Sequence, residues 1–221
     1  MPNPVPTALV IAARGVRVAA RAGRALLALW LASAGAVHGQ QPIDAPILKP
    51  FADNRQWLLV EDVRYTVGQT TTTIVVPSGF VTDFASIPQP FWGTGLSPNG
   101  TYSKAAIVHD YLYWTQGCTR KQADNILLIA MKESEVDTTT RAAIYEGVRF
   151  GGDSAWESNA AERARGLPRI IPDSDLEFGP TILWRDYRAL LAQRGVADPA
   201  LELAPAYCAI GDTTDVPGRN N

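Results

Sequence analysis

One histidine stands out as a candidate reactive group, because an acid follows it directly and a tyrosine follows four residues later. His109, Asp110 and Tyr113 lie in the segment 104–114, for which we predict a helix. Neighbouring helix positions point about 100° apart, so His109 and Asp110 serve different partners, whereas Tyr113 shares the face of His109. A histidine held by an acid can deprotonate a water molecule. His109 is therefore the candidate general base.

The acid that we expect to hold this histidine is Asp124, on a second predicted helix over residues 120–133. Asp124 sits among apolar residues, where an unpaired carboxylate is costly. The two helices meet near Gly117 and should pack antiparallel. His109 lies about eight residues before that turn and Asp124 about seven after it, so their heights nearly match. Asp124 would then fix the tautomer of the imidazole and stabilise its charged form. The alternative is a solvent-facing Asp124 beside a purely structural His-Asp pair.

Asp110 has a different predicted role, as a metal ligand. The upstream loop 91–96 reads Phe-Trp-Gly-Thr-Gly-Leu and can present backbone carbonyls. One carboxylate with several carbonyls and waters is a calcium environment. Such an ion would polarise a substrate carbonyl and hold its oxyanion. Calcium is therefore the cofactor that the sequence suggests.

Asp83 and Ser86 form a secondary candidate cluster. In one interpretation the Thr-Asp-x-x-Ser turn caps backbone groups. In another, Asp83 faces the helix pair and joins the site. A triad of Ser86, His109 and Asp124 is a third option, although Ser86 lacks the G-x-S-x-G turn that presents many serine nucleophiles.

Composition restricts the classes of function. The chain has 221 residues, 46% hydrophobic and 19% charged, which is ordinary for a globular protein. A net charge of −2 gives no general attraction to nucleic acid, so we expect no nucleic-acid partner. The histidines are His38 and His109, and removal of an N-terminal signal peptide would leave His109 alone, which excludes a zinc peptidase with two or three histidine ligands.

The first 39 residues have the order of a secretory signal peptide. Residues 1–43 contain no acid, and four arginines precede an apolar run at 25–36 that ends in small residues. That run is too short to span a bilayer unaided. We therefore expect an exported protein, periplasmic or secreted; an organelle transit peptide, a disordered tail or an early start codon are the alternatives. In an oxidising compartment Cys118 and Cys208 could form a disulfide; otherwise they are two unpaired apolar residues.

The remaining pattern predicts an α+β fold: an N-terminal β-hairpin or small antiparallel sheet packed on a short antiparallel helical core, with a loop-rich C-terminal extension. The hairpin comes from 57–67 and 73–76, and a third helix over 138–149 should stop at a Gly-Gly pair. The segments that we assign are a linker at 40–56, a core domain at 57–156, a partly helical extension at 157–204 and a disordered tail at 205–221.

Three separated blocks resemble a bacterial and phage domain family of unknown function. They read V-P-S-G-F-V-T-D-F-A-S-I-P, then A-A-I-V-H-D-Y-L-Y, then G-V-R-F-G-G-D-S-A-W. The resemblance covers roughly residues 57–156 and implies no activity.

A looser resemblance, over about residues 91–131, is to the core of secreted phospholipase A2. It rests on A-A-I-V-H-D-Y-L-Y followed by Q-A-D-N-I-L-L. The resemblance implies that His109 activates water, that Asp124 supports it and that Tyr113 bonds near it. It also implies that Asp110 binds calcium with carbonyls near Trp92, Gly93 and Gly95. The gap between His109 and Asp124 is shorter than in those enzymes by roughly seven residues, and their cysteine framework is absent.

Three functions follow as hypotheses. The first is an exported, calcium-dependent hydrolase of phospholipase A2-like type, acting on a lipid or ester with membrane lipid or a cell-envelope component as its partner. The second is a non-enzymatic, phage-derived or envelope-associated binding or assembly module. The third is a peptidoglycan or peptide hydrolase that uses the same acids and histidine.

Overall fold

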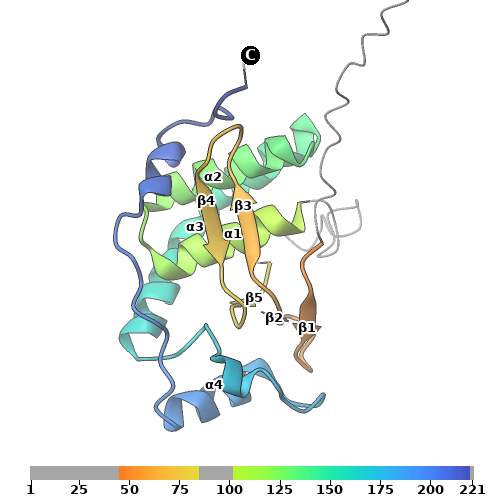
Figure 1. The fold of residues 1–221 in the computed structure, drawn as a ribbon, viewed down its shortest axis with the longest axis vertical. Coiled ribbons are helices and arrows are strands. Elements are labelled where there is room, and N and C mark those ends of the chain that lie inside the picture. The colour runs from red at the N-terminus through yellow and green to blue at the C-terminus, as the bar shows by residue number, and fades with distance from the viewer. Residues whose placement is uncertain (1–44, 85–101, 220–221) are drawn as a thin grey trace, which may run out of the picture. The chain divides into compact units, whose positions relative to one another are not determined.

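The chain places its short strands before its helices (Figure 1). The computed structural model describes residues 45–84 and 102–219, all within one compact unit that spans Gln41–Asn221. Antiparallel strands followed by helices make this an α+β fold, as the sequence predicts. The predicted signal peptide lies outside the described residues. Among the helices that the structure describes, none has the length and apolar character to cross a membrane.

Two small antiparallel sheets form from the first part of the chain. The first has the order β1-β2-β5, and the second is the hairpin of β3 and β4, with Val63 opposite Val76. In β3 the buried Val63 and Tyr65 alternate with exposed residues, so the hairpin turns one apolar face toward α1. The strands are β1 (Leu48–Pro50), β2 (Trp57–Leu59), β3 (Val63–Thr66), β4 (Thr73–Val76) and β5 (Val81–Thr82).

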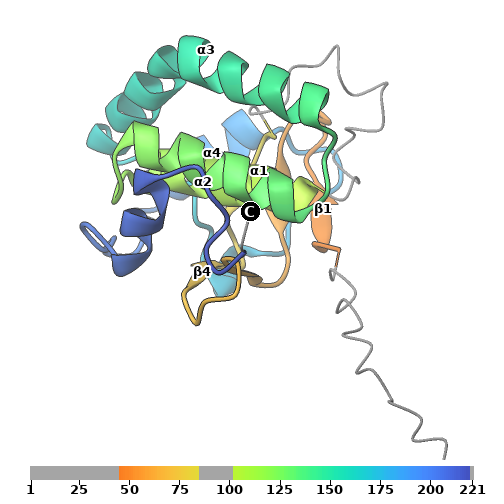
Figure 2. The same cartoon turned by 90° about the horizontal axis from the view of Figure 1, so that it is seen from above.

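Three helices form the centre of the fold, and α3 runs along α1 and α2 (Figure 2). The start of α2 is fixed by a capping box, in which the Thr119 hydroxyl accepts from the Gln122 amide and the Gln122 side chain accepts from the Thr119 amide. The described helical segments are α1 (Ser103–Thr115), α2 (Arg120–Glu133), α3 (Thr138–Ala164), the 3₁₀ turn η2 (Asp173–Asp175), α4 (Trp184–Gln193) and the 3₁₀ helix η3 (Ala206–Asp212).

The sheet of β1, β2 and β5 separates two apolar clusters. Leu59 packs with the hairpin and the central helices, whereas its neighbour Leu58 packs with Trp184 and Leu191 of α4. Successive strand residues point to opposite faces, so this one short strand serves both clusters. It thereby attaches α4 to the body that holds α1.

The third helix is longer than predicted, because it continues through Gly151 and Gly152 to Ala164. A glycine inside a helix costs only about 1 kcal/mol relative to alanine, which packing can offset. Here Gly152 lies against Tyr113, and a Cβ on it would fall 2.4 Å from the tyrosine hydroxyl. The glycine serves a close helix contact and does not end the helix.

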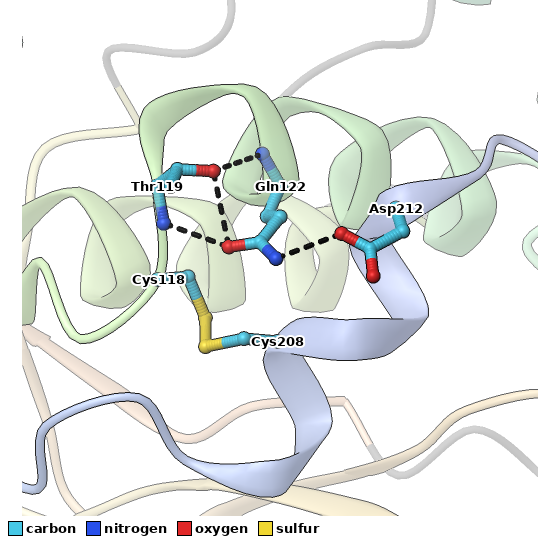
Figure 3. Close-up of a disulfide and its surroundings, with 5 residues drawn as sticks. All are labelled: Cys118, Thr119, Gln122, Cys208 and Asp212. Carbon is cyan, nitrogen blue, oxygen red and sulfur yellow. Dashed lines mark hydrogen bonds between the residues drawn. A yellow bond between two sulfur atoms is a disulfide. The ribbon is translucent and has the colours of Figure 1, made fainter.

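The boundaries predicted for the two ends of the chain also need correction. The predicted linker 40–56 contains β1 and the fully buried Phe51, so its last part belongs to the fold. The predicted strand 57–67 is split between two sheets. The predicted disordered tail contains η3, which packs on α2 and carries Cys208 in a disulfide with Cys118 (Figure 3). The disulfide and the packing on α2 order this segment, although its composition alone predicts disorder.

Candidate functional site

The candidate site is built around the carboxylate of Asp124, which is fully buried in α2. Its Oδ1 lies 3.1 Å from Nε2 of His109 and accepts a 2.6 Å hydrogen bond from the hydroxyl of Tyr113. Both partners lie in α1, one helical turn apart. The contact predicted from matching helix heights is therefore present, and the solvent-facing alternative for Asp124 is wrong.

Two arginines complete the environment of the same carboxylate. Oδ2 of Asp124 accepts from Arg120 at 3.2 Å and from Arg149 at 2.9 Å. Burial by itself would raise the pKa of Asp124, but the hydrogen bonds from His109 and Tyr113, together with Arg149, outweigh it and leave the pKa below its usual value. Asp124 is therefore ionised at neutral pH and can accept a hydrogen bond from the imidazole.

Tyr113 supports this arrangement as a hydrogen-bond donor. Burial, followed by its hydrogen bond to Asp124, raises the pKa of its hydroxyl well above the usual value. The hydroxyl therefore keeps its proton throughout the physiological range. Its ring lies 4.2 Å from the imidazole of His109, centroid to centroid, so the tyrosine also packs against the histidine.

Asp110 faces a different part of the fold, as the helix geometry predicts. Its Oδ2 accepts from the Thr82 hydroxyl at 2.6 Å and from the backbone amide of Phe84 at 3.0 Å. Phe84 has a φ of +52°, an unusual conformation for a bulky residue and a sign of local strain. Burial and the neighbouring charge of Asp83 raise the pKa of Asp110 to about 6.

Asp83 joins the same region, in agreement with the second interpretation of its turn. Its carboxylate lies 3.4 Å from a guanidinium nitrogen of Arg169. Arg169 is itself anchored by a 2.7 Å bond from its Nε to the carbonyl of Val81 in β5. Asp83, Asp110 and His109 all line one cavity. Ser86 lies outside the described residues, so the Ser86 triad is a prediction that the structure does not address.

The cavity has a volume of about 630 Å³, sufficient for a small-molecule substrate. His109, Asp110 and Tyr113 line it from α1, and Gly147 and Gly151 line it from α3. The cavity is also lined by Arg169, which precedes α4, and by Trp184, Arg185 and Arg188 of α4. His109 is only 2% exposed and meets this space at the cavity wall.

The predicted calcium site is described only in part. Trp92, Gly93 and Gly95 lie outside the described residues. Among the residues that the structure does describe, no group of three or more acids, histidines or cysteines is arranged for a metal ion. Asp83 and Asp110 alone fall short of the six to eight oxygens that calcium takes, and Arg169 competes for Asp83. Calcium binding at Asp110 therefore stays a prediction.

Sequence reasoning missed four residues that complete the site: Thr82, Arg120, Arg149 and Arg169. Arg120 had a local signal, because it precedes Asp124 by four residues on one helix. Arg169 had none, since its contacts span up to 88 residues of sequence.

His109, Asp110 and Asp124 lie within a stretch of the chain that is similar to a known domain family. Residues 57–148 match the family described as "Protein of unknown function (DUF1353)", so this segment is similar to that family. An uncharacterized protein of Sinorhizobium fredii, y4jT, is 32% identical over 95 residues, which is 42% of this chain and 28% of that protein. No solved structure matches significantly. The matches bear out the resemblance to a family of unknown function and give no support to the phospholipase resemblance.

Proposed function

We propose that this protein is a hydrolase in which His109, held by Asp124, activates a water molecule against a carboxylic ester, with lipid esters as the first substrate class. The observation that carries the proposal is the buried contact of 3.1 Å between Nε2 and Asp124 Oδ1, on the wall of a cavity. A bond from a carboxylate to one ring nitrogen fixes the tautomer and leaves the other nitrogen as the base.

The proton movements follow from that geometry. Nε2 carries its hydrogen toward Asp124, so Nδ1 is the nitrogen that accepts a proton from water. The hydroxide formed adds to the ester carbonyl, and the imidazolium returns the proton to the leaving alkoxide. The bond between the carbonyl carbon and the alkoxy oxygen breaks, and the products are a carboxylic acid and an alcohol. Asp124 stabilises the imidazolium while it exists, and Tyr113 keeps that carboxylate in place.

Calcium and export belong to the proposal on separate grounds. Calcium rests on Asp110 and on loop carbonyls outside the described residues, so no step above depends on it. Export rests on the N-terminal pattern and on the disulfide between Cys118 and Cys208, a bond that persists mainly in oxidising compartments.

Hydrolysis by the full chain tests the proposal directly. The substrates are phosphatidylglycerol vesicles, soluble p-nitrophenyl esters and muropeptides, each with calcium or with a chelator. We expect ester hydrolysis that His109→Ala lowers by about 10²–10⁴-fold, the usual contribution of a general base. Tyr113→Phe, which removes one bond to Asp124, should lower it by about tenfold. Asp173→Asn, at an exposed carboxylate, is the matched control and should leave the rate unchanged.

A specific observation favours a non-enzymatic alternative. Asp124 binds side chains from α1, α2 and α3, so the cluster also joins the three central helices. If that were its whole role, wild-type protein would be inert on every substrate while His109→Ala only lowered the melting temperature. Release of muropeptides without ester hydrolysis would instead identify a peptidoglycan hydrolase.

A further inference from the structure

The wall of the cavity that α4 forms is basic. Arg169 lies before α4, and Arg185 and Arg188 lie within it; all three line the cavity that His109 also lines. All three arginines are already in ion pairs: their partners are Glu162 for Arg188, Asp83 for Arg169 and Asp186 for Arg185. These arginines lie outside segment 57–148, the part of the chain that is similar to the family.

Arg188 is fixed in place but incompletely bonded. Its Nε donates to the carbonyl of Pro168 at 2.7 Å, and its Nη1 donates to Glu162 at 2.6 Å. The guanidinium lies over the rings of Trp114 and Trp184, at 5.2 and 5.5 Å from their centroids. Its Nη2 is buried and, among the described residues, has no hydrogen-bond partner. A buried donor without an acceptor is costly, so this geometry suits an acceptor that the described residues do not supply.

Arg169 places a second positive charge beside the same tryptophan. Its guanidinium lies 5.6 Å from the ring of Trp114, while its ion pair with Asp83 is long at 3.4 Å. Two guanidiniums that share one ring repel each other, and an oxyanion between them would relieve the repulsion. The side chain of Arg185 is 81% exposed and pairs at 3.2 Å with the exposed Asp186, so it adds a third, solvent-screened cation at the cavity.

We propose that Arg188, together with Arg169 and Arg185, forms a subsite for an oxyanion of the substrate, a phosphate or a carboxylate. Arginine suits this task, because its planar fork of donors matches both groups in geometry and charge. The inference deepens the proposed hydrolase function by naming the charge of its substrate. Binding at the subsite nevertheless requires no chemistry at His109, so the two proposals can fail separately.

Calorimetric titration of the full chain with three six-carbon probes tests the subsite. Hexyl phosphate and hexanoate carry the two oxyanions, and hexanol is the neutral control. We expect an anionic probe to bind and hexanol not to bind. Arg188→Gln should weaken that binding by about tenfold or more, the range for a hydrogen bond to a charged group. Arg185→Gln, at an exposed position, should weaken it by about threefold. The anionic probe that binds with the higher affinity identifies the oxyanion as a phosphate or a carboxylate.

Two further variants make the outcome decisive. Arg165→Gln removes an equal charge from an exposed residue outside the cavity lining and should leave the affinity unchanged. His109→Ala should also keep the affinity within about twofold, whether or not the wild type hydrolyses esters. If Arg188→Gln does not fold, the subsite is tested by comparing the affinity of Arg185→Gln for the anionic probe with that of Arg165→Gln. Absence of anion binding, or equal weakening by those two variants, overturns the subsite.

Discussion

Asp110 is a buried acid whose ionisation is unfavourable in the folded protein. Burial and the charge of Asp83 raise its pKa from 3.8 to about 6. Between these values the folded state binds a proton that the unfolded state has released, so the free energy of unfolding falls as pH rises through this window. Above pH 6 the full cost remains, on the order of 2–3 kcal/mol. A destabilising carboxylate on a cavity wall is a common feature of functional sites.

Asp110→Asn removes this cost while keeping an oxygen that can accept from Thr82 and Phe84. We expect the variant to be more stable than wild type at pH 7, by up to about 2 kcal/mol, and equally stable near pH 4. Urea unfolding at several pH values between 4 and 7 measures the difference. Asp173→Asn, at an exposed carboxylate, serves as the control and should change neither the stability nor its slope. A variant with the same pH slope as wild type would show that Asp110 is not the group that titrates.

Helix α3 allows a matched test at the scale of an element, because two adjacent glycines meet different surroundings. A Cβ at Gly152 would lie 2.4 Å from the hydroxyl of Tyr113, whereas a Cβ at Gly151 meets nothing within 4 Å. Gly151→Ala should therefore stabilise the helix by up to about 1 kcal/mol. Gly152→Ala should destabilise the protein by about 1–3 kcal/mol, because α3 or Tyr113 must shift.

The readout that separates packing from site geometry is the activity of the same two variants. Gly152→Ala displaces the tyrosine that bonds Asp124, so ester hydrolysis should fall together with stability. Gly151→Ala should keep the contact between His109 and Asp124. Stabilisation by both alanines would contradict the close approach of α3 to Tyr113.

At the scale of the elements, the sequence predicts those features of the helices that depend on a local pattern of residues. The short turn near Gly117 and the matching heights of His109 and Asp124 are properties of two adjacent helices, and they are enough to predict the contact of the two side chains. The continuation of α3 was missed, because a glycine pair inside a helix and one at its end look alike without the neighbour Tyr113. The second wall of the cavity was missed, because Arg169 and Arg188 reach it through long-range packing.

At the scale of the whole molecule, the C-terminal segment is held to the site helices by one covalent bond and several hydrogen bonds. The disulfide joins Cys208 in η3 to Cys118 in the turn between α1 and α2, across 90 residues of sequence. Beside it, Gln122 donates to Asp212 (Figure 3). Further along α2, the side chain of Asn125 donates to the carbonyl of Gly211. The C-terminal segment thus packs on and stabilises α2, the helix that carries Asp124.

Removal of the disulfide should therefore lower global stability while leaving the local contact of His109 intact. Closing a loop of this length contributes about 4.6 kcal/mol through the entropy of the unfolded chain. We expect the double variant Cys118→Ser and Cys208→Ser to lose that order of stability in urea unfolding, and wild type in reducing agent to match it. Amide hydrogen exchange should rise first in η3, because packing and hydrogen bonds alone then hold it on α2. Unchanged exchange there, with unchanged stability, would show that packing on α2 suffices and that the bond constrains nothing.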